Sequence, residues 1–489
     1  MLNTVRDLLD RLNRDGIRYC HWKSNWALER TLRGETDLDL LIDRYDAQRF
    51  RTLLVGLGFE PSIETGVQAL PSTEHHHALD AESGVIVHVH AYYRVISGES
   101  IAKNYRLPIE AMLLDNVRRE GLINVPARGA ELIVFVLRML VKHTTPVELA
   151  FLVRDWAAVR QEVEWLVTDA AIQEAEGLLA RWMPRFELDL FRQCVEALRR
   201  PDPVWRRIGL GFRVRAVLRG LNRKSLPQAL LSEFWRFGGL VANRLTGSTR
   251  KLTPAGGGLV VAFVGSEATG KSTMLAETQR WLGEHYTVKR IHAGKPPATA
   301  LTFVPHVLLP SLRRLLPEQR TTRVEAEYLQ ESVPSPRRFP LVFGLRSVML
   351  AYERKLLLTR AFARSSNGTI VLCDRYPSSR SGAPDSPQLG HLPAPDAKMS
   401  FRRWLKVLEA RLYRDIPRPD LVIYLTAPLD VTLARNAARA KIEEESFVRI
   451  RHSQTSSLEF DDVPVHKINT DQPLETTVRE VREVIWDAL

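Results

Sequence analysis

LVVAFVGSEATGKST, residues 259–273, decides the fold of the C-terminal part of this 489-residue chain. Its first six residues are apolar and predict a buried strand, and the residues from Gly265 to Ser272 fit the pattern G-x-x-x-x-G-K-[ST]. Glycines in such a loop let backbone N–H groups turn inward around phosphate oxygens. The stretch therefore predicts a phosphate-binding loop between a strand and a helix.

The chemistry of the loop assigns a role to each residue type. Lys271 places a positive charge at the β- and γ-phosphates of a bound nucleotide, and the Ser272 hydroxyl is a ligand for Mg²⁺. A chance glycine-rich turn is the alternative, but the strand before the loop and the helix after it favour a phosphate site. The expected nucleotide-binding residues are Gly265, Thr269, Gly270, Lys271, Ser272 and Thr273.

Further apolar runs follow this loop and indicate the class of fold. Residues 370–373 and 421–425 are predicted as buried strands, and 463–468 as a last strand, with helical segments between them. Strands that alternate with helices predict an α/β domain with a parallel sheet and helices on both faces. Residues 296–340 are rich in proline and arginine and do not fit a simple crossover, so they predict an insertion or lid.

Three segments carry a resemblance to a known family. Asp374-Arg375-Tyr376 directly follows the strand TIVLC, Arg354 lies on the preceding helix AYERKLLLTRAFA, and RPDLVIYLTAPLDVTLARNAARAK follows later. With the phosphate loop, these segments make residues 258–489 similar to the thymidylate kinase-like branch of P-loop nucleotide kinases. The resemblance implies ATP- and Mg²⁺-dependent phosphoryl transfer.

The same resemblance implies roles for individual residues. Glu267 stands where the family carries an acid inside the loop, and Asp374 is expected to hold Mg²⁺ or its waters. Arg375 and Arg354 are expected to clamp the acceptor phosphate, because a guanidinium group binds phosphate through two hydrogen bonds. The lid residues Arg435, Arg439 and Lys441 are expected to close over the transferring group, or alternatively to be solvated surface charges.

The acceptor is less well defined than the donor. After Tyr376 the sequence PSSRSGAPDSPQLG departs from the usual thymidylate-binding sequence. It is closer to kinase-like proteins found with polysaccharide-biosynthesis enzymes, in which DRYP is followed by D-x-P, here Asp385-Ser386-Pro387. The expected acceptor is therefore a nucleotide or a related small phosphorylated molecule.

The N-terminal segment contains a pair of carboxylates. Asp37 and Asp39 in TDLDLL, residues 36–41, are predicted on one face of a strand, where two carboxylates suit a divalent metal. With the upstream HWKSN, residues 21–25, this run makes residues 1–125 resemble a nucleotidyltransferase-like α+β domain of the polymerase-β type. Lys23-Ser24 replaces the glycine pair of that family.

The third carboxylate of that family is absent from the expected neighbouring strand VIVHVHAYYR, residues 85–94. His88 and His90 share one face of it and, beside Asp37 and Asp39, would form a site suited to Mn²⁺ or Zn²⁺. Hydrogen bonding within the sheet is the other interpretation of these histidines. The cluster His75–His77 is expected to be solvated or to lie on a hairpin face, and not to form a metal site by itself.

Residues 126–250 show helical spacing and separate the two flanking domains. Between Arg199 and Lys251 the chain has thirteen Lys or Arg residues against two acids, which accounts for most of its net charge of +12. This basic connector suits an anionic partner surface, either lipid or nucleic acid, or the chain's own acidic domains. Residues 249–258 contain a proline and three glycines and predict a linker.

Composition agrees with a globular, cytoplasmic enzyme. Hydrophobic residues make up 45% and charged residues 26%, and three widely spaced cysteines predict no disulfide framework. No apolar run reaches the length of a membrane span. The main hypothesis is a P-loop kinase. The alternatives are a nucleotidyltransferase with a regulatory P-loop domain and a nucleotide-gated binding protein that docks through its basic connector.

Overall fold

The computed structural model describes residues 1–64, 70, 72–98, 103–142, 156–199, 204–225, 228, 238, 251–299, 302–303, 339–390, 392, 400–438, 443–456 and 458–489. The chain forms two compact units, Met1–Ala255 and Gly256–Leu489. The predicted segments 1–125 and 126–250 thus share one unit. Most of the predicted insertion at 296–340 lies outside the described residues. Within the described ranges, every helix is too short or too polar to cross a membrane.

The C-terminal unit is built on a parallel sheet. Its five strands have the order β12-β13-β11-β14-β15, and each pairs with its neighbours in parallel. The predicted α/β fold with a parallel sheet is therefore confirmed. Because Phe263 of β11 is in register with Asp374 of β13, the loops that follow these two strands emerge side by side at one sheet edge.

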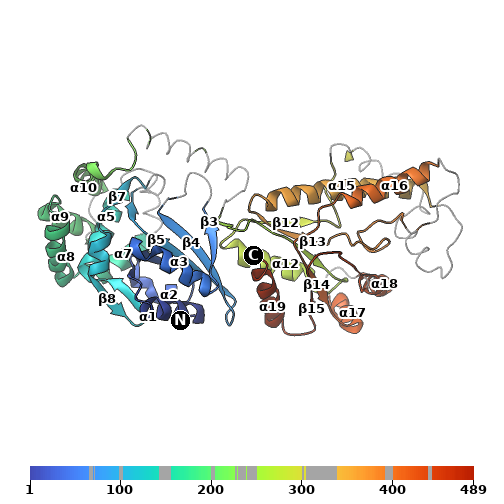
Figure 1. The fold of residues 1–489 in the computed structure, drawn as a ribbon, viewed down its shortest axis with the longest axis horizontal. Helices are drawn as coiled ribbons and strands as arrows, with labels where there is room; N and C mark the ends of the chain where they lie inside the picture. The colour runs from blue at the N-terminus through green and yellow to red at the C-terminus, as the bar shows by residue number, and fades with distance from the viewer. Residues whose placement is uncertain are drawn as a thin grey trace. The chain divides into compact units, whose positions relative to one another are not determined.

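Helices cover both faces of this sheet, with α15 and α16 along one side and α12 and α19 along the other (Figure 1). Apolar residues of the central strands form the core, including the fully buried Val261, Phe263 and Leu372. The elements are β11 (Val260–Val264), α12 (Lys271–Gly283), β12 (Val288–His292), α15 (Leu341–Ser365), β13 (Ile370–Asp374), α16 (Phe401–Arg414), β14 (Leu421–Thr426), α17 (Leu429–Ala437), α18 (Glu445–Thr455), β15 (Val465–Asn469) and α19 (Leu474–Trp486).

The N-terminal unit contains a mixed sheet. Its six strands have the order β1-β2-β5-β4-β3-β10, in which only β2 and β5 pair in parallel. Residues Leu38 and Leu40 of β2, with Val87 and Val89 of β5, pack against helices α1 and α3 in one apolar core. The predicted linker contributes β10, since Thr253 and Pro254 pair with β3.

A second apolar core in this unit is helical. Buried residues of α5, α8 and α9 pack together with Leu210 and Val214 of α10, as the helical spacing predicted. Part of the basic connector is therefore packed: Arg207 lies over the Trp156 ring at 4.6 Å, and Arg215 donates to the Val141 carbonyl at 2.9 Å. The binding of an anionic surface by residues 199–251 stays a prediction, because much of that segment lies outside the described residues.

The elements of the N-terminal unit are α1 (Asn3–Arg14), β1 (Tyr19–His21), η1 (Asn25–Ala27), α2 (Leu28–Leu32), β2 (Leu38–Ile42), η2 (Arg44–Asp46), α3 (Ala47–Gly56), β3 (Glu60–Ile63), β4 (Thr73–Asp80), β5 (Val85–Tyr92), β6 (Val95–Ser97), β7 (Tyr105–Leu107), α4 (Glu110–Asp115), β8 (Val117–Glu120), β9 (Ile123–Pro126), α5 (Arg128–Lys142), α7 (Trp156–Leu166), α8 (Asp169–Trp182), α9 (Leu188–Arg199), α10 (Val204–Val217), η3 (Arg219–Leu221) and β10 (Thr253–Pro254).

Candidate functional site

The loop between β11 and α12 has the backbone conformation that its glycines allow. Gly265 has a φ of 146°, and a Cβ atom there would lie 2.3 Å from the Leu425 carbonyl oxygen. Gly270 has a φ of 85° and precedes the first residue of α12. Since the first backbone N–H groups of a helix have no partner within it, the start of α12 favours a negatively charged group.

Lys271 is buried and folds back across this loop. Its ammonium group donates to the carbonyl oxygen of Gly265 at 3.0 Å and to that of Ser266. The Thr269 hydroxyl also donates to the Ser266 carbonyl, at 2.9 Å, which fixes the turn. The adjacent Ser272 is exposed. The loop thus places the ammonium group of Lys271 and the hydroxyl group of the exposed Ser272 on consecutive residues.

A pocket of about 170 Å³ opens in front of the loop. Asp374, at the carboxyl end of β13, reaches it, and the nearest cationic partner of this carboxylate is Arg290, at 3.4 Å. The pocket is lined by Glu267, Lys271, Ser272, His292, Asp374 and Arg375. Five of these six residues were predicted from the sequence, and they come together because β11 and β13 are adjacent.

Two arginines beside the pocket are joined by carboxylates. Arg354 on α15 is buried and pairs with Asp385 at 2.7 Å, and it also donates to the Ala293 carbonyl and the Tyr413 hydroxyl. Arg375 pairs with Glu267 and, at 3.4 Å, with Asp385. Arg375 and Asp385 have φ values of 71° and 63°, a left-handed conformation that is strained for residues other than glycine.

The electrostatics of this network keep its acids ionised. Burial opposes ionisation of Asp385, but the charges of Arg354 and Arg375 outweigh it and lower the pKa of this carboxyl group. Burial also opposes ionisation of Glu267, yet the nearby Arg375 and Lys271 lower its pKa. Each arginine is therefore held in place by a negative partner within the network.

Not every predicted residue lies at this pocket. Arg435 of the expected lid donates to the Thr470 hydroxyl at 3.0 Å and to the Thr470 carbonyl at 2.7 Å, and it is not among the residues that line the pocket. Arg439 and Lys441 lie outside the described residues. Thr269 and Thr273 belong to the loop and to α12 but do not line the pocket.

Sequence reasoning missed four residues around the pocket. Arg290 and His292 belong to β12, a strand without an apolar run, so nothing marked its end. Tyr413 contacts Arg354 from α16, and Arg451 on α18 adds positive charge near Glu267. No local motif identifies either residue, because each reaches the site only through the folding of a distant helix.

The predicted carboxylates of the N-terminal unit face a row of histidines. Asp39 lies in β2, whereas Asp37 immediately precedes the strand, which begins at Leu38 and not at Thr36. The Asp37 carboxylate contacts His88 Nδ1 at 2.8 Å, and the Asp39 carboxylate lies 3.4 Å from His90 Nδ1. The structure therefore brings together the two carboxylates and two imidazoles that the strand faces predicted.

Lys23 forms an ion pair with Asp39. Its ammonium group lies 2.9 Å from the Asp39 carboxylate and donates to the Tyr92 hydroxyl at 2.9 Å. Burial opposes ionisation of Asp39, but Lys23 and His90 outweigh it and lower the pKa of this carboxyl group. Burial lowers the pKa of His90 to about 4, so this imidazole is neutral at pH 7. A neutral imidazole is the form that binds a metal.

Two further histidines extend this row. His75 stacks on His90 with ring centres 4.2 Å apart, and His77 stacks on His88 at 4.3 Å. The sequence placed this cluster on a hairpin face, and it lies in β4, which pairs with β5. These four rings therefore share one face of the sheet with the carboxylate pair.

The buried Glu131 forms a hydrogen bond with Asn25, which follows Lys23 in the chain. The side-chain amide of Asn25 donates through Nδ2 to the Glu131 carboxyl group at 2.8 Å, and its oxygen Oδ1 contacts His21 Nδ1 at 2.6 Å. Burial raises the pKa of Glu131 to about 7. Ser24 has a φ of 60°, the left-handed conformation that glycine adopts more easily.

Comparisons with known proteins concern a stretch of about the length of the C-terminal unit. No protein-family model matches the chain. The thymidylate kinase of Pseudomonas fluorescens (strain Pf0-1) is 27% identical over 226 residues, which is 44% of this chain and 90% of that protein. The thymidylate kinase of Bacillus thuringiensis (strain Al Hakam) is 26% identical over 244 residues, or 47% of this chain and 99% of that protein.

Among solved structures, deoxyadenosine kinase from M. mycoides with bound dATP matches 46% of this chain and 98% of its own, with 11% identity and a TM-score of 0.27. The similarity to thymidylate kinases indicates a P-loop nucleoside kinase-like region.

Proposed function

We propose that the C-terminal unit transfers the γ-phosphoryl group of ATP to a nucleotide or a related small phosphorylated acceptor. One observation carries this proposal: Lys271, Asp374 and Arg375 line a single pocket at the start of α12. Phosphoryl transfer depends on positioning and charge neutralisation, and these three side chains supply both.

The loop is the donor side of the proposed reaction. Backbone N–H groups at the start of α12 would bind the phosphates, and Lys271 would exchange its contacts with the Gly265 and Ser266 carbonyls for phosphate oxygens. Its ammonium group then stabilises the charge that develops on the transferred group. Because the side chain is buried, little water competes for that interaction.

The residues also fit a magnesium ion. Mg²⁺ prefers oxygen ligands and retains several waters, and the Ser272 hydroxyl and the Asp374 carboxylate provide two oxygens in the same pocket. When bound, the ion would neutralise charge on the β- and γ-phosphates. Asp374 would serve by exchanging its 3.4 Å contact with Arg290, its ion-pair partner among the described residues, for the ion.

The acceptor side is the network of Arg354, Arg375 and Asp385. An acceptor phosphate would compete with Asp385 for two guanidinium groups that are already oriented by Tyr413 and Glu267. Asp385 comes from the segment that departs from the thymidylate-binding sequence. We therefore infer that this aspartate takes part in the choice of acceptor.

Mass spectrometry with ATP, Mg²⁺ and a panel of phosphorylated and unphosphorylated acceptors tests the proposal. The wild-type chain should yield a product that has gained one phosphoryl group. The Lys271→Ala variant should lose this activity by at least about a hundredfold, since losing a charge contact in the transition state costs several kcal/mol. A nucleotidyl adduct, or normal turnover by a folded Lys271→Ala protein, would refute it.

We propose separately that the N-terminal unit binds a divalent metal through Asp37 and Asp39. The set of two carboxylates with the imidazoles of His88 and His90 suits Mn²⁺ or Zn²⁺ better than Mg²⁺. Lys23 must leave Asp39 for a metal to bind there. Because Lys23 must be displaced, we expect the affinity for the metal to be modest and the unit to be a poor or altered nucleotidyltransferase.

A further inference from the structure

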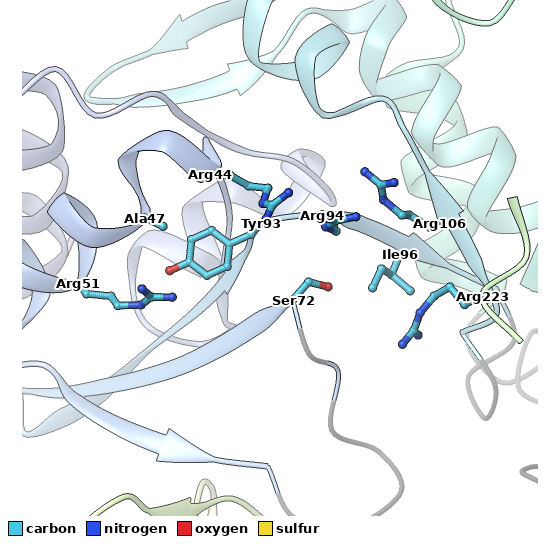
Figure 2. Close-up of a pocket in the computed structure, with 9 residues that line it drawn as sticks. All are labelled: Arg44, Ala47, Arg51, Ser72, Tyr93, Arg94, Ile96, Arg106 and Arg223. Carbon is cyan, nitrogen blue, oxygen red and sulfur yellow. The ribbon is translucent and has the colours of Figure 1, made fainter.

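A cavity of about 510 Å³ in the N-terminal unit is lined by an unusual number of arginines (Figure 2). Its walls come from five separate segments of the chain, and none of the lining residues is acidic. The lining residues are Arg44, Ala47, Arg51, Ser72, Tyr93, Arg94, Ile96, Arg106 and Arg223. We refer to this cavity as the arginine pocket.

The folding of the chain positions each wall of the arginine pocket. Arg44, Ala47 and Arg51 are spaced three and four residues apart along η2 and α3, so they lie on one helical face. Arg106 of β7 is directly opposite Ile96 of β6. In Figure 2, Arg51 and Arg223 lie at the two ends of the row, and the other arginines lie between them.

Backbone hydrogen bonds fasten the remaining segments to these walls. The Tyr93 N–H donates to the Ser72 carbonyl at 3.0 Å. The Arg223 N–H donates to the Asn104 carbonyl at 2.7 Å, and the Arg223 guanidinium group donates to the Lys103 carbonyl at 3.1 Å. These two hydrogen bonds therefore hold both the backbone and the guanidinium group of Arg223 beside the start of β7.

Among the described residues, a single carboxylate pairs with an arginine of the arginine pocket. Arg51 pairs with Glu74 at 2.6 Å, but no carboxylate of the described residues pairs with Arg44, Arg94, Arg106 or Arg223. Burial lowers the pKa of Arg223, because desolvation disfavours the charged form of its guanidinium group. Like charges gathered around one cavity repel each other, and a bound anion would relieve this repulsion.

The arginine pocket is distinct from the carboxylate pair. Tyr93 belongs to the apolar core that β5 shares with α1 and α3, together with Leu38 and Leu40 of β2. His88 and His90 instead contact Asp37 and Asp39, and they alternate with the core residues Val87 and Val89 along β5. The two sites therefore use opposite faces of the sheet.

We propose that the arginine pocket binds a small molecule with two or more linked phosphate groups. Guanidinium groups bind phosphate oxygens through paired hydrogen bonds, and several of them match a ligand with several negative charges. The volume lies within the range of small-molecule sites, and a concave pocket fits such a ligand better than a membrane or a duplex. Tyr93, Ile96 and Ala47 add an apolar wall.

Calorimetric titration of the full-length Lys271→Ala protein with inorganic tripolyphosphate, in about 0.15 M salt, tests this proposal. The Lys271→Ala change suppresses binding at the phosphate loop, so the remaining site should take up one tripolyphosphate. Adding Arg94→Gln and Arg106→Gln should weaken binding by about tenfold or more, because two guanidinium groups that would donate charged hydrogen bonds to the phosphates are lost.

A matched pair of substitutions controls for net charge and for folding. Arg6→Gln and Arg185→Gln remove the same two charges from exposed positions of this unit, and they should leave the affinity unchanged. Replacing Arg94 and Arg106 by lysine keeps the charge and should give an intermediate loss. Circular dichroism should show that all these variants are folded at the temperature of the titration.

Two further arms identify the ligand. If the protein binds ADP more tightly than tripolyphosphate, the apolar wall contacts a nucleoside. If the two affinities are equal, the site recognises the phosphate chain alone. Both results support the proposal. Unchanged affinity in the Arg94→Gln/Arg106→Gln variant, or an equal loss in the control pair, would overturn it. Binding of duplex DNA or anionic vesicles that tripolyphosphate cannot displace would also overturn it. None of these outcomes depends on kinase activity.

Discussion

Asp385 is the residue whose replacement tests the acceptor network most sharply. Its carboxylate pairs with Arg354 at 2.7 Å and with Arg375 at 3.4 Å, and its side chain is only 13% exposed. Asp385→Asn keeps the size of the side chain and an oxygen that can still accept from Arg354. The variant therefore removes one negative charge while the geometry of the network is retained.

The expected cost follows from burial. The Arg354 side chain is only 7% exposed, so removing its counter-charge leaves a largely desolvated cation. Breaking a buried ion pair by removing one partner costs about 3 kcal/mol. A dianion should reverse this cost, because the uncovered guanidinium groups bind it in place of the carboxylate. Sulfate should therefore stabilise the Asp385→Asn variant more than the wild type.

Amide hydrogen exchange read by mass spectrometry measures this effect locally. The free energy of opening of β13 should fall by about 3 kcal/mol in Asp385→Asn and recover when sulfate is added. Asp462→Asn is the matched control, since Asp462 pairs with Arg418 at 2.8 Å but both side chains are more than half exposed. The control should change stability by less than about 0.5 kcal/mol. Equal effects in the two variants, or no differential response to sulfate, would refute the network as a phosphate site.

Three further predictions concern other parts of the chain. Burial raises the pKa of Glu131 from 4.5 to about 7. The protonated carboxyl group therefore contributes its full stability below pH 4.5, and this contribution is lost as the pH rises through about 7. Between pH 5 and 8, the free energy of opening of α5 in Glu131→Gln should rise by about 3 kcal/mol relative to the wild type, as measured by hydrogen exchange. A difference between the two proteins that stays constant with pH would contradict this. A Cβ at Gly294 would lie 2.6 Å from Arg375 Cδ, so Gly294→Ala should raise KM for the acceptor by about tenfold, whereas Gly283→Ala, with no atom within 4 Å, should not. In titrations with Mn²⁺, Asp37→Ala and His90→Ala should both weaken binding, and a loss in Asp37→Ala alone would remove the histidine from the site.

The fold of the C-terminal unit could be predicted because its signals are local. A buried strand, a glycine loop and a helix follow one another within residues 259–283, and two later apolar runs mark β13 and β14. The edge strand β12 was missed because only Ile291 of VKRIH is buried. An edge strand pairs with only one other strand and is partly exposed to solvent, so its sequence lacks the continuous apolar run of a central strand.

The sites could be predicted only where residues close in sequence or on adjacent strands build them. Asp37 and Asp39 meet His88 and His90 because alternation along a strand fixes which face a side chain occupies. The partnership of Arg354 with Asp385 could not be predicted, because it depends on a left-handed residue in a loop 31 positions later. The arginine pocket draws on five separate segments and leaves no motif.

Transfer of label from ATP tests the central claim most directly. The full-length protein is incubated with Mg²⁺, an acceptor panel and ATP that carries radioactive phosphorus at either the γ- or the α-position. The account predicts that only the γ-label reaches an acceptor, and that Lys271→Ala abolishes this transfer while Asp39→Asn leaves it intact. Transfer of the α-label that survives Lys271→Ala and disappears in Asp39→Asn would contradict it.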